Sequence, residues 1–504
     1  MFGCSRDKDL FMAWAQDNGG NRKPLREMSR RQFVRVSGMA AMGNFALNGP
    51  GSEASSRRPG AADLLLHGAL VVTMDAKRRV FRDGAIAIRE GNIVDVGSST
   101  SLLARWKSSS RIDLAGLVAT PGLINSHIHL TGDQLLPGLR PDDSVPSEHL
   151  TKWGLPAYQH SQPEDDRAAA RFVALQMLRQ GTTAFIEAGT CRHPAAVLEG
   201  LAGMGIRGSI GTWAGDRWPQ AGFFSMTTDQ ALKRIHDALA LPQGRVEVWP
   251  DVLGTAICSD ELYVGAAQLA REYNRHWTFH MSPSPSDIVA YQARTRRDPL
   301  VQLDHLGVLD DRCVVGHAIH ISDNEVATVN RSGATVVFSP HSALRLSSGV
   351  TFVGRHPDLE SMALGTDALN ASNHVNILNA AALACNIYAE ARKTYATVTA
   401  ERALEWLIPG GANALGWRDH TGTLEVGKWA DIAVFDVGVP VYNVANALVH
   451  GSPRAIHVFI EGNQVLQDGH VKGETTIIKD AVEAARRVAK RSGLPLATGW
   501  PLLD

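Results

Sequence analysis

Between residues 119 and 420, short apolar segments alternate repeatedly with longer segments of helical character. Examples are "RAAARFVALQMLRQG" followed by "TTAFIEAG", and "SMALGTD" followed by "NHVNILNAAALACNIYAEA". Strands that alternate with helices form parallel sheets, and about 300 residues of such units are typical of a closed parallel barrel. We therefore predict an α/β fold whose main part is a (β/α)8 TIM-like barrel. In such a barrel, functional side chains lie where the strands end.

β-rich segments flank the predicted barrel on both sides. Residues 62–97, "ADLLLHGALVVTMDAKRRVFRDGAIAIREGNIVDVG", alternate apolar runs with turn residues, and the same pattern occurs in "GTLEVGKWADIAVFDVG" and "RAIHVFIEGNQVLQDG" near the other end. This pattern predicts antiparallel strands, so we expect one small β-sandwich domain built from both chain ends. The predicted order is an N-terminal extension (1–60), the first part of the sandwich (61–118), the barrel (119–420), the second part of the sandwich (421–475), and a C-terminal helix and tail (476–504).

The composition excludes several classes of partner. Of the 504 residues 44% are hydrophobic, which is enough for a large core, and 50 Lys and Arg residues balance 51 Asp and Glu residues. The balance gives no electrostatic reason to expect nucleic acid, and no apolar run is long enough to predict a membrane span. The five cysteines are scattered and predict neither a disulfide framework nor a zinc knuckle. We expect a small-molecule substrate, while a homo-oligomer stays open.

The N-terminal extension carries a possible export signal. Residues 29–49, "SRRQFVRVSGMAAMGNFALNG", begin with the Arg30-Arg31 pair and continue with a weakly apolar segment. This order resembles a bacterial twin-arginine signal, with a basic amphipathic helix as the alternative. We therefore expect the twin-arginine export machinery as a partner and a periplasmic or secreted location. The residues that precede this segment are polar and unusually many for a signal, so Met28 is an alternative first residue of the protein.

Five metal-competent side chains occur at the ends of predicted strands. In "VATPGLINSHIHLTGD", His127 and His129 are two residues apart, so a strand would place them on the same face as half of a metal site. His280, His317 and Asp367 each end another apolar run. A core histidine or a helix N-cap would explain one of them alone. Their shared place at strand ends favours a metal site.

Several motifs together resemble the amidohydrolase superfamily. These motifs are "PGLINSHIHL", "GTTAFIEAG", "LGVLDDRCVVGHAIHISDNEV", "GATVVFSPHSALRLSSG", "ALGTDALNAS" and "GTLEVGKWADIAVFD". They are most similar to the branch that holds cytosine deaminase, adenosylhomocysteine deaminase and the triazine hydrolases. The resemblance runs from about residue 62 to residue 470.

The resemblance implies a role for each of these side chains. His127 and His129 from strand 1, His280 from strand 5 and Asp367 from strand 8 would bind the metal, and His317 from strand 6 would be a catalytic histidine. Three imidazoles and a carboxylate suit Zn²⁺ or Fe²⁺ and leave a position for water. The expected nucleophile is a metal-bound hydroxide. Asp367 would also be catalytic, by moving the proton of the water, while His317 stabilises the oxyanion or orients the water.

A single divalent metal is expected, with Zn²⁺ preferred over Fe²⁺. Binuclear relatives commonly use a carboxylated lysine from strand 4, but this chain has no lysine between Lys233 and Lys393. Glu187, which we assign to strand 3, is the remaining candidate for a second ion, and a structural role is the favoured interpretation.

The sequence departs from the branch after His280, where a proton-shuttling glutamate is usual. Pro283 occupies that position, and Asp287 is too far along the chain to assume equivalence. The leading prediction is therefore hydrolysis of a non-peptide C–N bond (amide, urea, carbamate or lactam) in a small cyclic or aryl molecule. The alternatives are deaminase-like or chlorohydrolase-like displacement on a heteroaromatic ring, and an inactive exported ligand-binding protein. Four aromatic residues of the loop 212–226 favour either an aromatic ligand or a loop core: Trp213, Trp218, Phe223 and Phe224.

Overall fold

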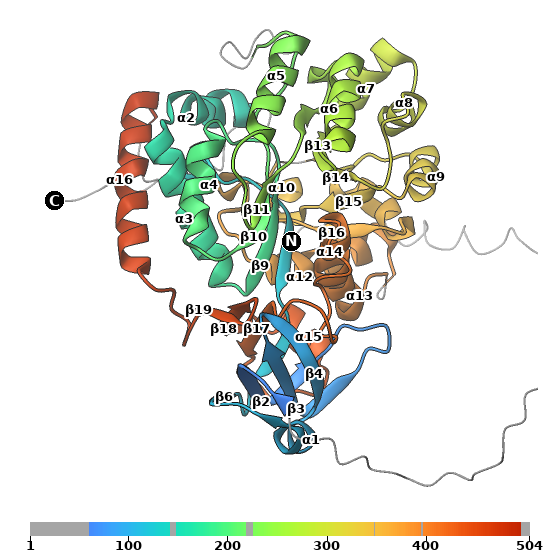
Figure 1. Cartoon of the computed structure of the whole chain (residues 1–504). Coiled ribbons are helices and arrows are strands. Elements are labelled where there is room, and N and C mark those ends of the chain that lie inside the picture. Colours follow the sequence, from blue (N-terminus) through green and yellow to red (C-terminus); the bar gives the residue numbers. More distant parts are fainter. Residues whose placement is uncertain (1–59, 142–147, 218–224, 347, 395–396, 495–504) are drawn as a thin grey trace, which may run out of the picture. The chain divides into compact units, whose positions relative to one another are not determined.

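The computed structural model describes most of the chain (Figure 1). The described residues are 60–141, 148–217, 225–346, 348–394 and 397–494. The chain divides into a unit of residues 1–56 and a unit of residues 57–504, and only the second contains described residues. The predicted export signal with Arg30 and Arg31 lies outside them.

Parallel strands form two sheets in the middle of the chain. One sheet has the order β11 (Val246–Val248), β10 (Arg207–Ile210), β9 (Thr182–Glu187) and β8 (Leu123–Ile128). The other has the order β12 (Asp251–Gly254), β13 (Trp277–Met281), β14 (Cys313–His317), β15 (Thr335–Phe338) and β16 (Met362–Leu364). The sheets meet at a parallel bridge between Ile128 and Asp367, and β11 leads directly into β12 at their other edges.

Helices follow the parallel strands, which confirms the predicted α/β class (Figure 1). The longer ones are α3 (Pro163–Leu178), α4 (Pro194–Ala202), α5 (Thr228–Leu239), α6 (Asp260–Glu272), α7 (Pro285–Thr295), α8 (Pro299–His305), α9 (Asp323–Ser332) and α12 (Ile377–Arg392). Shorter ones are α2 (Leu155–His160), α10 (Pro340–Arg345), α11 (Leu369–Ser372), α13 (Ala400–Glu405), α14 (Gly411–Ala414) and α15 (Val444–His450). Their starts are locally encoded. Ser322, for example, accepts a hydrogen bond from the Glu325 amide, and the Glu325 carboxylate accepts one from the Ser322 amide.

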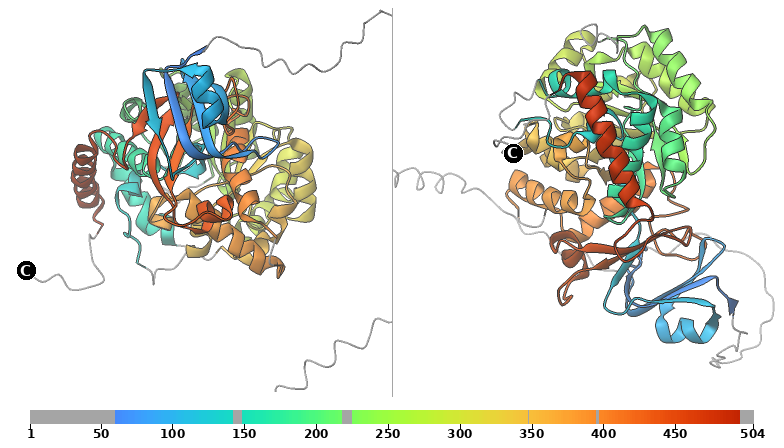
Figure 2. Two further views of the ribbon diagram at one scale, coloured as in Figure 1. Left: turned by 90° about the horizontal axis from the view of Figure 1, so that it is seen from below. Right: turned by 90° about the vertical axis from the view of Figure 1, so that its left-hand side faces the viewer.

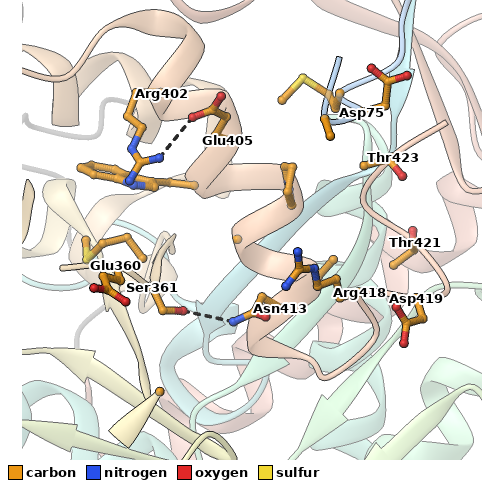
Figure 3. A pocket seen from close by; sticks show the side chains of 18 of the residues that line it. Asp75, Glu360, Ser361, Arg402, Glu405, Asn413, Arg418, Asp419, Thr421 and Thr423 are labelled. Atoms are coloured by element: carbon orange, nitrogen blue, oxygen red, sulfur yellow. Dashed lines mark hydrogen bonds and ion pairs between the residues drawn. The ribbon is translucent and has the colours of Figure 1, made fainter. Parts of the chain in front are cut away.

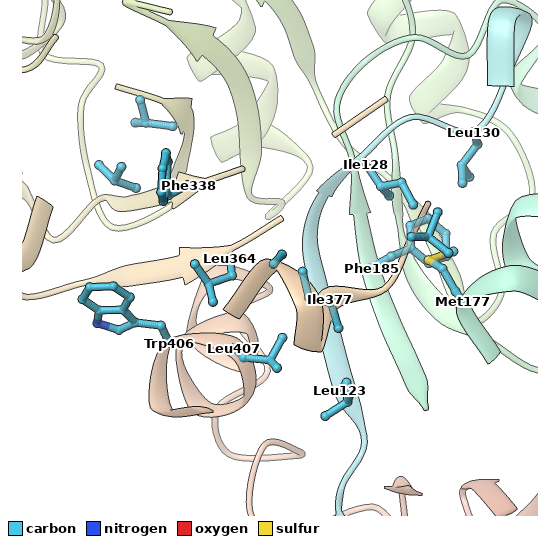
Figure 4. Packing of buried hydrophobic residues seen from close by; sticks show 14 of the residues in the cluster. Leu123, Ile128, Leu130, Met177, Phe185, Phe338, Leu364, Ile377, Trp406 and Leu407 are labelled. Atoms are coloured by element: carbon cyan, nitrogen blue, oxygen red, sulfur yellow. The ribbon is translucent and has the colours of Figure 1, made fainter. Parts of the chain in front are cut away.

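The two faces of the parallel strands pack in different clusters. Outward-facing residues such as Phe185 and Phe338 join the large core beneath the helices (Figure 4). Inward-facing residues from both sheets, including Ile186, Val314 and Val337, share a second cluster. Because both sheets enclose one inner cluster, the arrangement is of the TIM-barrel type.

Strands from the two chain ends form a separate mixed sheet. Its order is β19 (Asn463–Leu466), β18 (Arg454–Ile460), β17 (Ile432–Asp436), β7 (Val118–Pro121), β2 (Leu64–Val72), β3 (Val80–Arg89) and β4 (Asn92–Ser98), with β6 (Ser110–Asp113) beside β2. Leu66 and Ile86 from the first end share a buried cluster with Ile432 and Phe459 from the second. Residues from both chain ends therefore contribute to one small core.

The helix α16 (Glu474–Ser492) packs along α3 (Figure 2). Ala481 and Ala484 of α16 pack against Ala168 of α3. The fully buried carboxylate of Asp165 pairs with Arg487 at 3.0 Å, and also with Arg491. No helix in the described part of the chain has the length and apolar character needed to cross a membrane.

Candidate active site

The structure brings all five predicted side chains together at the carboxyl ends of the parallel strands. His127 lies in β8, His129 directly follows β8, His280 lies in β13, His317 ends β14 and Asp367 follows β16. One ligand atom each from His127, His129 and His280 lie within 4.8 Å of one another, as do those from His127, His317 and Asp367. The Nε2 atom of His129 is 3.1 Å from Oδ1 of Asp367. Residues that lie up to 240 positions apart in the sequence, as His127 and Asp367 do, thus form one cluster.

The backbone is held in unusual conformations at these strand ends. His317, Ala318 and Asp367 have φ values of 72°, 46° and 63°, a left-handed region that residues other than glycine seldom adopt. The amides of Thr366 and Asp367 both donate to the carbonyl of His127, at 3.1 Å and 2.9 Å. Such conformations cost free energy and are concentrated at functional sites, where the surrounding contacts enforce them.

Hydrogen bonds orient two of the imidazoles. The Thr190 hydroxyl donates to Oε1 of Glu187 at 2.5 Å, so it accepts a hydrogen bond from Nδ1 of His129 at 3.2 Å. The Nδ1 atom of His280 donates to the carbonyl of Leu253 at 2.9 Å. Both contacts place a proton on Nδ1, so Nε2 is the ring nitrogen available to the cluster, as in metal-binding histidines.

His127 provides the test of whether the site fits a metal ion. Both of its ring nitrogens are buried without a hydrogen-bond partner among the described residues. Leaving buried polar atoms unsatisfied is costly, and a bound cation satisfies them. Glycines make room for this ring, because a Cβ at Gly365 would lie 2.6 Å from Cβ of His127, and one at Gly316 would lie 2.7 Å from its Cε1. The donor set and the orphaned nitrogens therefore fit a divalent ion.

Burial favours the neutral form of three of the histidines. Burial and then the neighbouring His317 and His129 lower the pKa of His280 to about 3. Burial likewise lowers the pKa of His127 and of His317. A neutral imidazole has a nitrogen lone pair that can bind a metal ion or accept a hydrogen bond.

His129 and Asp367 form a strongly coupled pair. Burial alone would lower the pKa of His129, but its contacts with Asp367 and Glu187 outweigh burial and raise the pKa to about 10. Burial alone would raise the pKa of Asp367, yet the hydrogen bond from His129 and the nearby imidazoles hold it well below its usual range. The ionised carboxylate thus attracts cations to this end of the site, and a proton and a metal ion compete for Nε2 of His129.

Four of the five clustered side chains, all except His127, line a cavity of about 370 Å³. The apolar and aromatic residues of its wall are Leu150, Tyr158, Trp213, Leu253, Ile257, Pro283, Leu346, Ala368 and Ala371. The rings of Trp213 and Tyr158 contact each other edge to face, with centroids 5.2 Å apart. Trp213 is therefore part of the pocket wall, whereas Trp218, Phe223 and Phe224 lie outside the described residues.

Two acidic residues of the pocket were missed or set aside by the sequence interpretation. Asp133 lines the wall, and burial raises its pKa to about 6 although Tyr158 and Gln134 hydrogen bond to it. Asp287 also lines the pocket, although its separation from His280 along the chain gave no reason to expect it there. Acidic residues shortly after the metal-binding motifs were the signal that the sequence offered for both.

Glu187 also needs a correction of strand number. It ends β9, which follows β8 directly in the sheet and is thus the second parallel strand rather than the third. Its carboxylate accepts hydrogen bonds from the amides of Gly189, Thr190 and Gly211 at 2.9–3.1 Å. These contacts agree with a structural role for Glu187.

A larger cavity of about 850 Å³ lies elsewhere, at the start of β16 (Figure 3). In its wall Arg402 pairs with Glu405 at 3.3 Å, and Asn413 donates to the Ser361 hydroxyl at 3.1 Å. None of the five clustered side chains belongs to its described lining. His129, His280, His317 and Asp367 line the smaller pocket instead.

Comparisons with known proteins agree with this assignment of the fold. Residues 118–490 match the model of the amidohydrolase family. A 5-methylthioadenosine/S-adenosylhomocysteine deaminase of Syntrophobacter fumaroxidans is 28% identical over 85% of this chain and 98% of its own length. A 5'-deoxyadenosine deaminase of Methanosarcina mazei is 25% identical over 85% and 99%.

Solved structures show the same fold. An adenosine deaminase from Xanthomonas campestris with bound zinc matches with a TM-score of 0.77 and 22% identity, over 86% of this chain and all of the other. An atrazine chlorohydrolase from Arthrobacter aurescens, complexed with zinc, matches with a TM-score of 0.73 and 22% identity, over 84% of this chain and all of the other. The chain therefore belongs to the amidohydrolase family and is a hydrolytic enzyme that acts on C–N bonds.

Proposed function

We propose that the chain is a metal-dependent hydrolase that removes a nitrogen substituent from a ring carbon of a small nitrogen heteroaromatic molecule. The observation that carries the proposal is the cluster of imidazoles and a carboxylate at the end of a pocket with aromatic walls. Among C–N bonds, the sequence favoured the amide type because no acid was expected in the pocket. Asp287 lines the pocket, which removes that objection, and relatives named as deaminases support the heteroaromatic choice.

In this proposal His127, His129, His280 and Asp367 hold one divalent ion, for which we propose Zn²⁺ with Fe²⁺ as the alternative. Zinc is present in the two solved neighbours described above. A divalent ion in such a site supplies Lewis acidity, lowering the pKa of water and polarising the electrophile. Three imidazole nitrogens and one carboxylate oxygen are ligand types that Zn²⁺ binds.

The remaining groups have roles that follow from their positions. The Nε2 atom of His317 lies 4.0 Å from Oδ2 of Asp367, so both side chains face the same small volume. Asp367 can accept the proton of the attacking water, and His317 can stabilise charge that develops at the reacting carbon. Trp213 and Tyr158 present rings to the pocket, which suits stacking against a flat substrate.

The test is a substrate panel with metal-replete protein. Aminopurines, aminopyrimidines and aminotriazines are compared with aryl amides, ureas and carbamates, and the release of ammonia or amine is measured. The proposal expects turnover of at least one aminoheteroaromatic class. Turnover confined to amides, ureas or carbamates would contradict it, and saturable binding without turnover of any compound would indicate an inactive ligand-binding protein.

We also propose export through the twin-arginine machinery, which would place the enzyme in the periplasm or outside the cell. The support is the Arg30-Arg31 pair followed by a weakly apolar segment. This route carries folded proteins, which suits an enzyme that must hold a metal ion.

A further inference from the structure

Three carboxylates among the described residues line the pocket, and two of them already have close partners. Asp367 contacts His129 at 3.1 Å and accepts a hydrogen bond from the Ala368 amide at 2.7 Å. Asp133 is fully buried and accepts a hydrogen bond from Nε2 of Gln134 at 2.5 Å. Both carboxylates therefore already have close partners on the protein.

Asp287 is placed differently. It lies in the first turn of α7, is partly exposed, and accepts a hydrogen bond from the Ser284 hydroxyl at 2.6 Å. A hydroxyl donor leaves the remaining lone pairs of the carboxylate available to a substrate. Asp287 therefore lines the pocket and has a carboxylate that, among the described residues, makes no hydrogen bond or ion pair with the proposed metal ligands.

The chain between β13 and α7 explains how Asp287 arrives there. Ser282, directly after β13, has a left-handed φ of 48°, which turns the chain sharply at the end of the strand. Pro283 then forms part of the pocket wall, and α7 begins at Pro285, so its first turn lies against the same pocket.

The proposed reaction needs a proton carrier. Water adds to the ring carbon through a new C–O bond, the C–N bond breaks, and the nitrogen leaves with the bonding electron pair. A poor leaving group such as an amine must receive a proton as that bond breaks, and this proton comes from the attacking water. A further carboxylate that receives this proton and delivers it to the leaving nitrogen completes the balance without any other reactant.

We propose that Asp287 is the catalytic residue that carries this proton to the substrate nitrogen. The inference rests on the proposed function and deepens it. Pro283, in the wall of the same pocket, has no ionisable group and cannot carry a proton. The inference assigns this role to a side chain from the first turn of α7.

The experiment compares Asp287→Asn and Asp287→Glu with the wild-type holoenzyme, using paired substrates that differ only in an amino or a chloro leaving group. Asp323→Asn is the matched control, because Asp323 also lies in the first turn of a helix after a parallel strand but its side chain is 86% exposed. Zinc content, melting temperature and KM are measured for every protein. These readouts separate a catalytic loss from a loss of folding, metal or binding.

For the amino substrate, Asp287→Asn is expected to lower kcat by about 10²–10⁴, the usual worth of one general acid or base. The chloro substrate should lose far less, because chloride leaves without a proton, and Asp287→Glu should recover part of the rate. A loss below threefold on the amino substrate would overturn the inference, as would equal losses on both substrates. If the wild-type enzyme hydrolyses only amides or ureas, the proposed function fails and the inference falls with it.

Discussion

The substitution Thr190→Val tests how the metal ligands are oriented. It removes the hydroxyl that links His129 to Glu187 while keeping the volume of the side chain. In the structure this hydroxyl lies 3.2 Å from Nδ1 of His129, whereas Oε1 of Glu187 is 3.8 Å from the same atom, beyond hydrogen-bond range. Without this hydroxyl, Nδ1 of His129 has no partner within hydrogen-bond range among the described residues. Losing such an outer contact costs about 10–100-fold in metal affinity, which corresponds to about 1.4–2.8 kcal/mol.

The assay is competition for Zn²⁺ against a chromophoric chelator, with Thr190→Ser as the control that keeps the hydroxyl. The valine variant should bind zinc about 10–100-fold more weakly than the wild type, and the serine variant within about threefold of it. Equal zinc affinity of the two variants would refute the argument that Thr190 orients His129.

Three further outcomes are expected. His127→Ala should lose bound metal and activity, because it removes a ligand from the centre of the cluster, and full activity in a folded, metal-free variant would disprove the assignment. His317→Asn should keep the metal but lose most of kcat, and a rate within about threefold of wild type would exclude His317 from bond breaking. Residues 28–58 fused to a folded reporter should direct its export, and the double change Arg30→Lys, Arg31→Lys should stop it. Unchanged export would remove the periplasmic proposal.

The sequence predicted the fold well because periodic patterns encode it. Alternating strands and helices gave the parallel sheets, and the two β-rich ends do pair, since β17 lies antiparallel to β7 with Val434 opposite Ala119. The strand-end positions of the five metal-competent residues also led to one cluster, because carboxyl ends of parallel strands meet at one edge.

The pocket could not be predicted in the same way. Asp287 reaches the cavity through a left-handed turn at Ser282 and the start of α7, and neither follows from residue spacing. Asp133 lies in a short helical turn after β8 (residues 132–135), where no periodicity signals which side chains face inward. Glu187 was assigned to the wrong strand because strand number depends on how each intervening segment folds. Side chains on such connections are set by local backbone geometry.

The central claim is that side chains from β8, β13 and β16 and their ends hold a single metal ion. Anomalous diffraction at the zinc absorption edge, from crystals of zinc-loaded protein, tests it most directly. We predict one peak within bonding distance, about 2.0–2.2 Å, of His127, His129, His280 and Asp367. A peak elsewhere, or the absence of any peak at these side chains in fully active protein, would contradict the account.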